Sequence, residues 1–473
     1  MLFNSFQFII FFSIVTSVYF LLPYQKRWIL LLLSSCYFYM SFVPVYILIL
    51  GFTIGVDYFT GIAIENAKNG QRKWFLLLSL VANIGVLSVF KYHNFINQNF
   101  TGILNCFHVS NPIPYLSILL PIGLSFHTFQ AMSYTIEVYR GNQKAEKHFG
   151  IFALYVLFYP QLVAGPIERP QNLLHQFREK FQFDLDRVGE GLKMMLWGFV
   201  KKIVIADRLA IYVNTTYNHT GQHSGASLLL ATIFFSFQIY CDFSAYSDIA
   251  IGTAKVMGFK LMVNFKRPYF AQTMAEFWKR WHISLSTWFK DYLYIPLGGN
   301  RLSATRWYMN LMVVFLLSGL WHGANWTYII WGALNGAYLV IEILTKKIHF
   351  PFLSSQLPQK LVRVFKILLV FVLSSFAWIF FRANTVSDAF VVIKKIASFK
   401  GPLFYENPSM LIYSFASIFL LLLVEMKQEF YIGSFSFMHH KSWVVRNLTY
   451  AVLIITILLM GVFDGGQFIY FQF

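Results

Sequence analysis

Long hydrophobic runs separated by short polar segments dominate this chain of 473 residues. A helix needs about 20 apolar residues to cross a hydrocarbon core of about 30 Å. The runs that approach this length are 5–22, 28–42, 44–64, 74–91, 115–138, 149–165, 191–206, 226–257, 307–322, 325–345, 363–381, 410–426 and 445–462. The short alternating strands of a membrane barrel are not part of the pattern. We therefore predict an all-α polytopic membrane protein with about 11–13 transmembrane or re-entrant helices.

Two of these runs contain residues that interrupt helices. "LLPIGLSFHTFQAMSYTIEVYRG" and "FYPQLVAGPIERP" combine proline and glycine with polar side chains. Irregular backbone at membrane depth is tolerated only where it is buried in protein or lines a wet cavity. The pattern therefore predicts a central cavity walled by broken helices. No repeat or linker divides the chain, so residues 1–473 are predicted to form a single integral-membrane domain.

Composition and charge agree with a membrane protein and narrow its partners. Hydrophobic residues make up 57% of the chain and charged residues 12%, against about 25% charged in soluble proteins. The net charge of +18 comes from bases in short loops, as the positive-inside bias predicts. These basic residues are suited to binding anionic membrane lipid and an anionic cytoplasmic ligand. Their distribution over short loops argues against nucleic acid as a partner. The three cysteines form no Cys/His cluster, so no metal site or disulfide framework is expected.

Polar residues concentrate between residues 238 and 335, which we take as the motif core. The stretch "QIYCDFSAYSDIAIG" places Asp242 and Asp248 in an otherwise apolar helix. A carboxylate inside a membrane needs a partner or a proton. Each Asp therefore serves either as part of a structural ion pair or cap, or directly in chemistry, and the sequence leaves both readings open.

The next stretch, "FWKRWHISLSTWFKDYLYIPLGGNR", predicts an interfacial amphipathic helix over 274–290. At helical spacing its tryptophans form one stripe, and an adjacent face carries Lys279, His282, Ser286 and Lys290. A basic, tryptophan-lined helix is typical of a membrane surface. A plain interfacial anchor would explain the tryptophans, lysines and Arg280, but it explains His282 less well.

The stretch "FLLSGLWHGANWTYIIWG" places His322 at the end of an apolar run, among small residues and Asn325. Small neighbours allow a ligand or another helix to approach the ring. A neutral imidazole is one donor and one acceptor, and its ordinary pKa near ~6.5 suits proton abstraction. The alternative is a core histidine that is hydrogen-bonded for packing.

Taken together, these motifs resemble the membrane-bound O-acyltransferase family. "CDFSAYSDIAIG", "FWKRWHISLSTWFKDYLYIPLGGNR", "GLWHGANWTYIIWGALNG", "AWIFFRAN" and "GQFIYFQF" carry the resemblance, which covers nearly the whole chain. It is closest to the bacterial alginate O-acetyltransferase branch; teichoic-acid D-alanyl transferases match less well outside these elements. The resemblance implies that His322 is essential and that His282 is a second catalytic histidine.

The resemblance also implies the reaction and its setting. A cytoplasmic thioester, acetyl-CoA, would meet an extracytoplasmic acceptor inside a bacterial inner membrane, and no bound cofactor is needed. An SGNH-type periplasmic acetyltransferase would pass the acetyl group to an exported polysaccharide such as alginate, with peptidoglycan as another acceptor. We expect Lys279, Arg280 and Lys290 to attract the CoA phosphates. Residues expected to line the cavity or support the histidines are Asp242, Asp248, Asn325 and Ser286.

Two functions of other classes remain open from the residues alone. Intramembrane His, Asp and Glu on broken helices equally suit a proton-coupled transporter or a flippase for a lipid-linked sugar. A carrier should show internal pseudo-symmetry and consume no thioester. A structural anchor for a polysaccharide export complex would keep product acetylation normal when His322 is replaced.

Overall fold

The computed structural model describes residues 1–118, 120–345, 358–430, 438, 440–463 and 468–469. Every regular element among them is helical, which confirms the predicted all-α class. The chain divides into two compact units. Unit 1 comprises Met1–Met195 and Tyr246–Met262, and unit 2 comprises Leu196–Ala245 and Val263–Phe473. The expectation of one functional domain stays a prediction.

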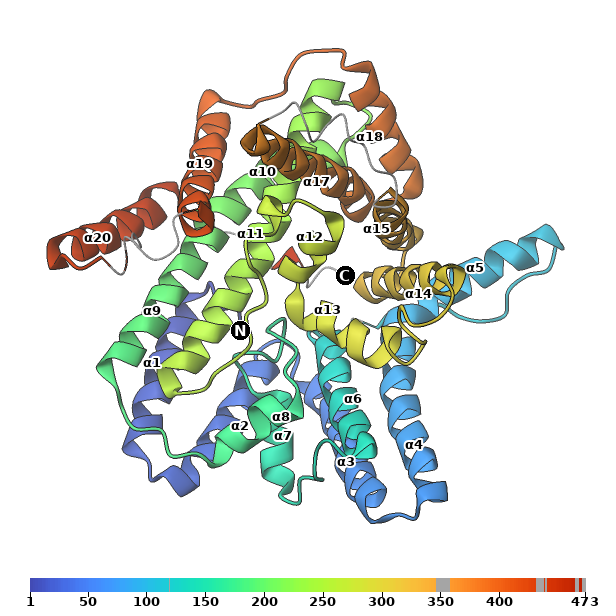
Figure 1. The fold of residues 1–473 in the computed structure, drawn as a ribbon, viewed down its shortest axis with the longest axis vertical. Helices are drawn as coiled ribbons and strands as arrows, with labels where there is room; N and C mark the ends of the chain where they lie inside the picture. The colour runs from blue at the N-terminus through green and yellow to red at the C-terminus, as the bar shows by residue number, and fades with distance from the viewer. Residues whose placement is uncertain (119, 346–357, 431–437, 439, 464–467, 470–473) are drawn as a thin grey trace. The chain divides into compact units, whose positions relative to one another are not determined.

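Unit 1 is built from the N-terminal helices (Figure 1). These are α1 (Phe6–Leu21), α2 (Tyr24–Met40), η1 (Pro44–Tyr46), α3 (Ile47–Asn66), α4 (Asn69–Leu87), η2 (Ser88–Tyr92), α5 (His93–Cys106), α6 (Leu124–Arg140), α7 (Phe149–Leu157), α8 (Pro170–Leu173), η3 (Leu174–Arg178) and most of α9 (Leu185–Phe199). The last turns of α11 (Gly225–Met257) also belong to it.

A polar cluster holds α3, α4 and α6 of unit 1 together. The Asp57 carboxylate is fully buried and accepts hydrogen bonds from Ser79 Oγ at 2.6 Å and Asn83 Nδ2 at 2.9 Å. Ser79 Oγ also lies 2.9 Å from Thr135 Oγ1. Buried polar groups need such partners because an unpaired one keeps its full desolvation cost. The cluster therefore fixes how these three helices pack.

The breaks predicted in unit 1 are present. Gly123 precedes α6 with φ of 78°, and a Cβ there would lie 2.9 Å from the Leu162 carbonyl oxygen. Helix α7 ends at Leu157, within the run 149–165 that the hydrophobic pattern predicted as one segment. Proline and glycine after that point leave non-helical backbone that is buried in protein, as membrane depth requires. The central cavity itself stays a prediction.

Unit 2 carries the motif core (Figure 1). Its elements are η4 (Val200–Ala206), α10 (Asp207–Asn218), the first turns of α11, η5 (Pro268–Phe270), α12 (Met274–Arg280), α13 (Ile283–Phe289), η6 (Lys290–Tyr294), α14 (Ala304–His322), α15 (Trp326–Thr345), α17 (Gln359–Arg382), α18 (Val386–Ser398), α19 (Pro408–Phe430) and α20 (Trp443–Met460). Tryptophan, phenylalanine and tyrosine side chains fill much of its core.

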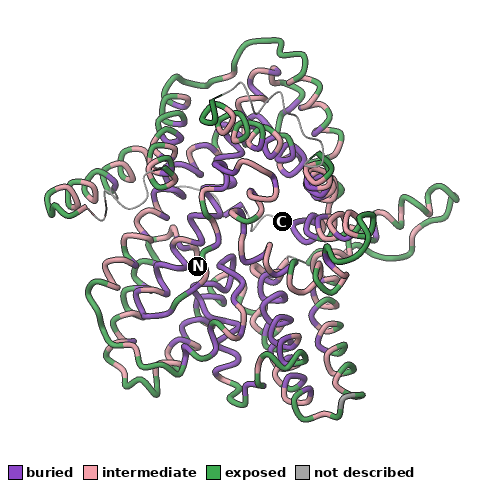
Figure 2. Tube along the Cα trace, viewed as in Figure 1, coloured by how far each residue is buried: buried purple, intermediate pink, exposed green. Residues whose placement is uncertain are grey.

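Among the described residues, seven helices are long and apolar enough to cross a membrane. They include α11, α15, α17, α19 and α20, and the multi-pass prediction is thereby confirmed. The predicted number of about 11–13 helices is higher because it also included shorter segments, such as the one that forms the 16-residue helix α1. Figure 2 shows exposed and intermediate residues along most of α20, of which only 6% is buried. Such a surface is suited to lipid.

Candidate active site

Helices α14 and α15 approach each other through glycines, and this contact positions His322. A Cβ on Gly319 would lie 2.3 Å from the Tyr328 carbonyl oxygen, and one on Gly332 would lie 2.2 Å from the Phe315 carbonyl oxygen. Only glycine leaves room for two backbones this close. The last residue of α14, His322, is therefore held against α15.

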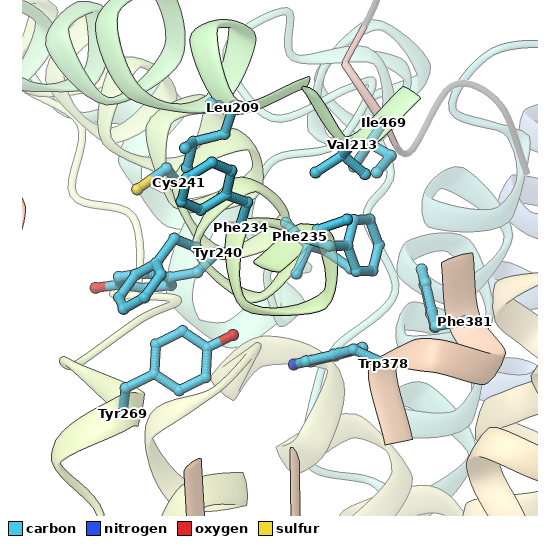
Figure 3. Packing of buried hydrophobic residues seen from close by; sticks show 14 of the residues in the cluster. Leu209, Val213, Phe234, Phe235, Tyr240, Cys241, Tyr269, Trp378, Phe381 and Ile469 are labelled. Carbon is cyan, nitrogen blue, oxygen red and sulfur yellow. The ribbon is translucent and has the colours of Figure 1, made fainter. Parts of the chain in front are cut away.

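The His322 ring is 3% exposed and lies in an aromatic enclosure. Its centroid is 4.9 Å from the rings of Trp321 and Trp331 and 5.6 Å from that of Phe381. Trp378 stacks on Trp331 at 5.6 Å. Figure 3 shows Trp378 and Phe381 on the same stretch of α17. The enclosure leaves the imidazole almost no exposure to solvent.

The hydrogen bond to Ser318 defines the tautomer of a neutral His322. Its Nδ1 lies 2.7 Å from the Ser318 carbonyl oxygen. A carbonyl oxygen can only accept, so Nδ1 must carry the proton. The lone pair is then on Nε2, which is the nitrogen that can take a proton from a substrate.

The segment 274–290 differs from the single amphipathic helix predicted for it. The structure has two short helices, α12 and α13, with Trp281 and His282 at the break. Thr273 caps α12 by accepting a hydrogen bond from the Glu276 amide at 3.0 Å. His282 adopts the left-handed conformation, with φ of 44° and ψ of 54°. The periodic pattern gave no sign of this break because His282 is not a residue type that usually marks one.

The break turns the His282 side chain inward, where it is 1% exposed. Its ring centroid lies 4.5 Å from that of Phe243 and 6.2 Å from that of Trp321. Trp321 also contacts His322, and the two histidines are close enough to interact electrostatically. The structure therefore brings together the two histidines that the sequence singled out.

The three basic residues expected to attract phosphate lie in different surroundings. Lys279 and Lys290 are exposed. Arg280 donates to both carboxylate oxygens of Glu429, at 3.1 and 3.0 Å, and to Glu276 at 2.6 Å. These paired bonds are geometrically specific. They fasten α12 to α19, so Arg280 already has a structural task.

Ser286 and Asn325 stabilise the elements that carry the histidines. Ser286 Oγ donates to the Trp281 carbonyl oxygen at 3.1 Å, across the break. Asn325 Oδ1 accepts from the Thr327 amide at 3.0 Å and so caps α15, while its Nδ2 donates to the Asn384 carbonyl at 3.3 Å. Side chains that cap helix starts typically contribute about 1 kcal/mol.

Asp242 is part of a buried ion cluster in unit 2. Lys202 Nζ lies 2.6 Å from Asp242 Oδ1 and 2.8 Å from Asp207 Oδ1. The amide of Ile469 donates to Asp242 Oδ2 at 2.7 Å. Lys202 sits in the π-helix η4, whose residues are all buried. The structural ion-pair reading left open by the sequence therefore describes the observed contacts of Asp242.

Asp248 lies in the part of α11 that belongs to unit 1 and is partly exposed. Its expected place near the histidines stays a prediction. Among the described residues, no group of His, Cys, Asp and Glu is arranged to hold a metal ion. Sequence reasoning missed Trp331, Trp378 and Phe381 as parts of the site, because aromatic residues in apolar runs look like ordinary core.

Comparison with known proteins decides the family. Residues 146–383 match the sequence profile of MBOAT, the membrane-bound O-acyltransferase family. The chain belongs to the membrane-bound O-acyltransferase family. This confirms the predicted resemblance and shows that the protein is an acyltransferase. Both histidines lie inside the matched segment, as do all the other predicted site residues.

Two kinds of O-acetyltransferase resemble the chain over most of its length. The "Probable alginate O-acetylase AlgI" of Azotobacter vinelandii is 39% identical over 404 residues, which cover 84% of this chain and 78% of that protein. The "Peptidoglycan O-acetyltransferase" of Helicobacter pylori is 34% identical, covering 80% and 75%. The "Teichoic acid D-alanyltransferase" of Streptococcus thermophilus is 31% identical over 243 residues, which cover only 48% of this chain and 57% of that protein.

Proposed function

We propose that this membrane-bound O-acyltransferase is an O-acetyltransferase that takes its acetyl group from cytoplasmic acetyl-CoA, with His322 as the general base. One observation carries the proposal: two buried histidines share the Trp321 ring, and in each a partner of Nδ1 leaves Nε2 as the basic nitrogen. A thioester is already activated, so the site needs a base and oxyanion donors rather than a redox or metal centre.

The transfer step balances with these parts. The oxygen of an acceptor hydroxyl forms a bond to the acetyl carbon, and the carbon–sulfur bond breaks. The hydroxyl proton moves to His322 Nε2 and from there to the departing thiolate. A positioned base of this kind typically contributes about 10²–10⁴-fold. The aromatic enclosure supports the step because water, which would hydrolyse the thioester, is excluded.

Negative charge on the thioester oxygen requires a hydrogen-bond donor. From the sequence, the candidate donors to this oxygen were His282, Asn325 or a nearby hydroxyl. In the structure Asn325 already donates to the Asn384 carbonyl. The indole Nε1 of Trp378 is buried and meets no acceptor among the described residues. Since Trp378 packs on Trp331 beside His322, its N–H is a donor that bound substrate can use.

The acceptor is proposed to be an exported polysaccharide, acetylated through a separate periplasmic enzyme of the SGNH type. Support comes from the relatives, whose names give alginate and peptidoglycan as acceptors. Both polymers lie outside the bacterial cytoplasmic membrane, which is the proposed location of this protein. Alginate is placed first because several alginate O-acetylases match at about 40% identity.

Acetyl-CoA turnover by the purified protein tests the proposal. The protein in detergent or liposomes is incubated with acetyl-CoA labelled on the acetyl group, and released CoA and transferred label are followed. We expect CoA release that depends on His322. Flux of a lipid-linked sugar or of protons with intact acetyl-CoA would instead support a carrier. Normal acetylation of the polymer in cells that carry His322→Ala would support the anchor.

We predict that Lys279→Ala and Lys290→Ala each raise the KM for acetyl-CoA several-fold and leave kcat nearly unchanged. Both side chains are exposed cations, Lys279 on α12 before the break at His282 and Lys290 after α13, and they are suited to binding CoA phosphates before chemistry. Steady-state kinetics at low ionic strength provide the measurement. Lys394→Ala, which removes an exposed lysine from α18, is the matched control. An unchanged KM in both variants would contradict this role.

A further inference from the structure

Asn264 holds the turn that carries His282. It is fully buried in the segment between α11 and η5. Its side-chain Oδ1 lies 3.1 Å from the Ser284 amide nitrogen and 3.0 Å from Ser284 Oγ. Its carbonyl oxygen accepts from the Ile283 amide at 2.9 Å. Asn264 therefore bonds to the chain on the C-terminal side of His282 through both main chain and side chain.

The turn needs this support because its conformation is unfavourable for a histidine. His282 has φ of 44°, and the left-handed region is strained for a residue other than glycine. The strain persists only where the surroundings determine the conformation more strongly. Hydrogen bonds from residues 283 and 284 to Asn264 supply that determination.

Asn264 also determines which ring nitrogen of His282 carries the proton. The Ser284 amide can only donate, so the Asn264 atom that faces it is the oxygen and not the nitrogen of the side-chain amide. The same Oδ1 lies 3.2 Å from His282 Nδ1. Because an amide oxygen only accepts, Nδ1 must be the protonated nitrogen. In the neutral ring the lone pair is consequently on Nε2.

We propose that Asn264 is a positioning residue for His282, which fixes the ring in the Nδ1–H tautomer so that Nε2 acts as a hydrogen-bond acceptor in the acyl-transfer site. This inference rests on the proposed function. Neutral His282 then holds an acceptor hydroxyl beside His322 rather than donating to the oxyanion. Ser318 fixes the tautomer of His322 in the same way, so the site presents two Nε2 lone pairs.

Several titratable groups on neighbouring elements of unit 2 can influence the protonation of the His282 ring. They include His322, Tyr240, Asp242, Lys266, Arg267, Tyr269, Glu276, Lys279, Arg280 and Lys290. His322 interacts electrostatically with the His282 ring. Asp242 is paired with Lys202, and Arg280 with Glu429. A new carboxylate at position 264 would face the His282 Nδ1 directly.

The substitution Asn264→Asp tests the proposal through the pH dependence of acetyl transfer. Aspartate keeps an acceptor for residues 282 to 284 but adds a negative charge, which stabilises the imidazolium form of His282. The ring then stays protonated to higher pH and lacks its Nε2 lone pair. We expect the acid limb of the pH–rate profile to move to higher pH by about one unit or more. In a His282→Ala background the same substitution should leave the residual profile unmoved.

Asn310→Asp is the matched control, because Asn310 is a buried asparagine on α14 that donates to the carbonyls of Leu297 and Gly299. It should lower stability without moving the acid limb. If Asn264→Asp does not fold, ¹⁵N NMR of histidine-labelled wild-type protein reads the tautomer, with His282→Ala as the assignment reference. An unmoved acid limb, or a proton on Nε2, overturns the proposal. A wild-type protein that consumes no acetyl-CoA would instead overturn the proposed function.

Discussion

Replacing His322 by alanine should abolish acetyl transfer, with a loss of at least about 10²-fold in kcat, while the protein still inserts into the membrane. The ring contacts Trp321, Trp331 and Phe381 and is almost fully buried. The bond from Nδ1 to Ser318 leaves Nε2 as the proton acceptor. Alanine removes this acceptor without touching the Gly319–Gly332 contact that joins α14 to α15. Label transfer from acetyl-CoA, normalised to the amount of folded protein, measures the loss.

His322→Phe separates chemistry from packing. Phenylalanine keeps most of the ring volume and its aromatic contacts but has no nitrogen. We expect it to be more stable than the alanine variant and equally inactive. Wild-type turnover in either variant would remove His322 from the mechanism. A phenylalanine variant that recovers activity would assign the ring to packing alone.

The second large effect is expected on stability, at Lys202. Its ammonium group lies between Asp207 and Asp242, with all three side chains buried. Lys202→Met keeps the volume of the chain but leaves two buried carboxylates uncompensated. Breaking a buried ion pair on one side costs about 3–5 kcal/mol. Thermal unfolding in detergent should therefore show a strongly lowered midpoint, and the fraction of folded protein should fall.

Two comparisons make this prediction specific. Lys193→Met removes a partly exposed lysine that pairs with Glu190 at 2.8 Å, and a pair of this kind contributes only about 0–1 kcal/mol. The combination Lys202→Met with Asp242→Leu removes opposite charges together and should recover part of the lost stability. Equal midpoints for Lys202→Met and Lys193→Met would contradict a stabilising role for the cluster.

Much of the fold follows from the hydrophobic pattern. The runs 226–257, 325–345 and 363–381 agree closely with α11, α15 and α17, because a helix lets a long apolar segment satisfy its own backbone hydrogen bonds in lipid. The pattern says nothing about α18 (Val386–Ser398), which was outside every predicted run. The break at His282 was also missed, since it depends on hydrogen bonds to a distant residue, Asn264.

The site could be predicted only in part. His322 and His282 stood out because an imidazole in an apolar stretch is unusual. Arg280 stood out for its charge, yet its partner Glu429 lies about 150 positions further along the chain, a pairing that sequence spacing does not show. The enclosing residues Trp378 and Phe381 come from α17, and their role depends on tertiary packing. Asn264 carries no signal beyond its residue type.

The glycine contact between α14 and α15 constrains how substrate reaches the imidazole. The backbones of the two helices touch at Gly319 and Gly332, with no side-chain layer between them, so this contact limits how the helices can shift against each other. Of the rings around His322, Trp321 and Trp331 belong to these two helices, and Phe381 comes from α17. We therefore expect a thioester to reach His322 through movement of Phe381 or of α17 rather than through separation of α14 from α15.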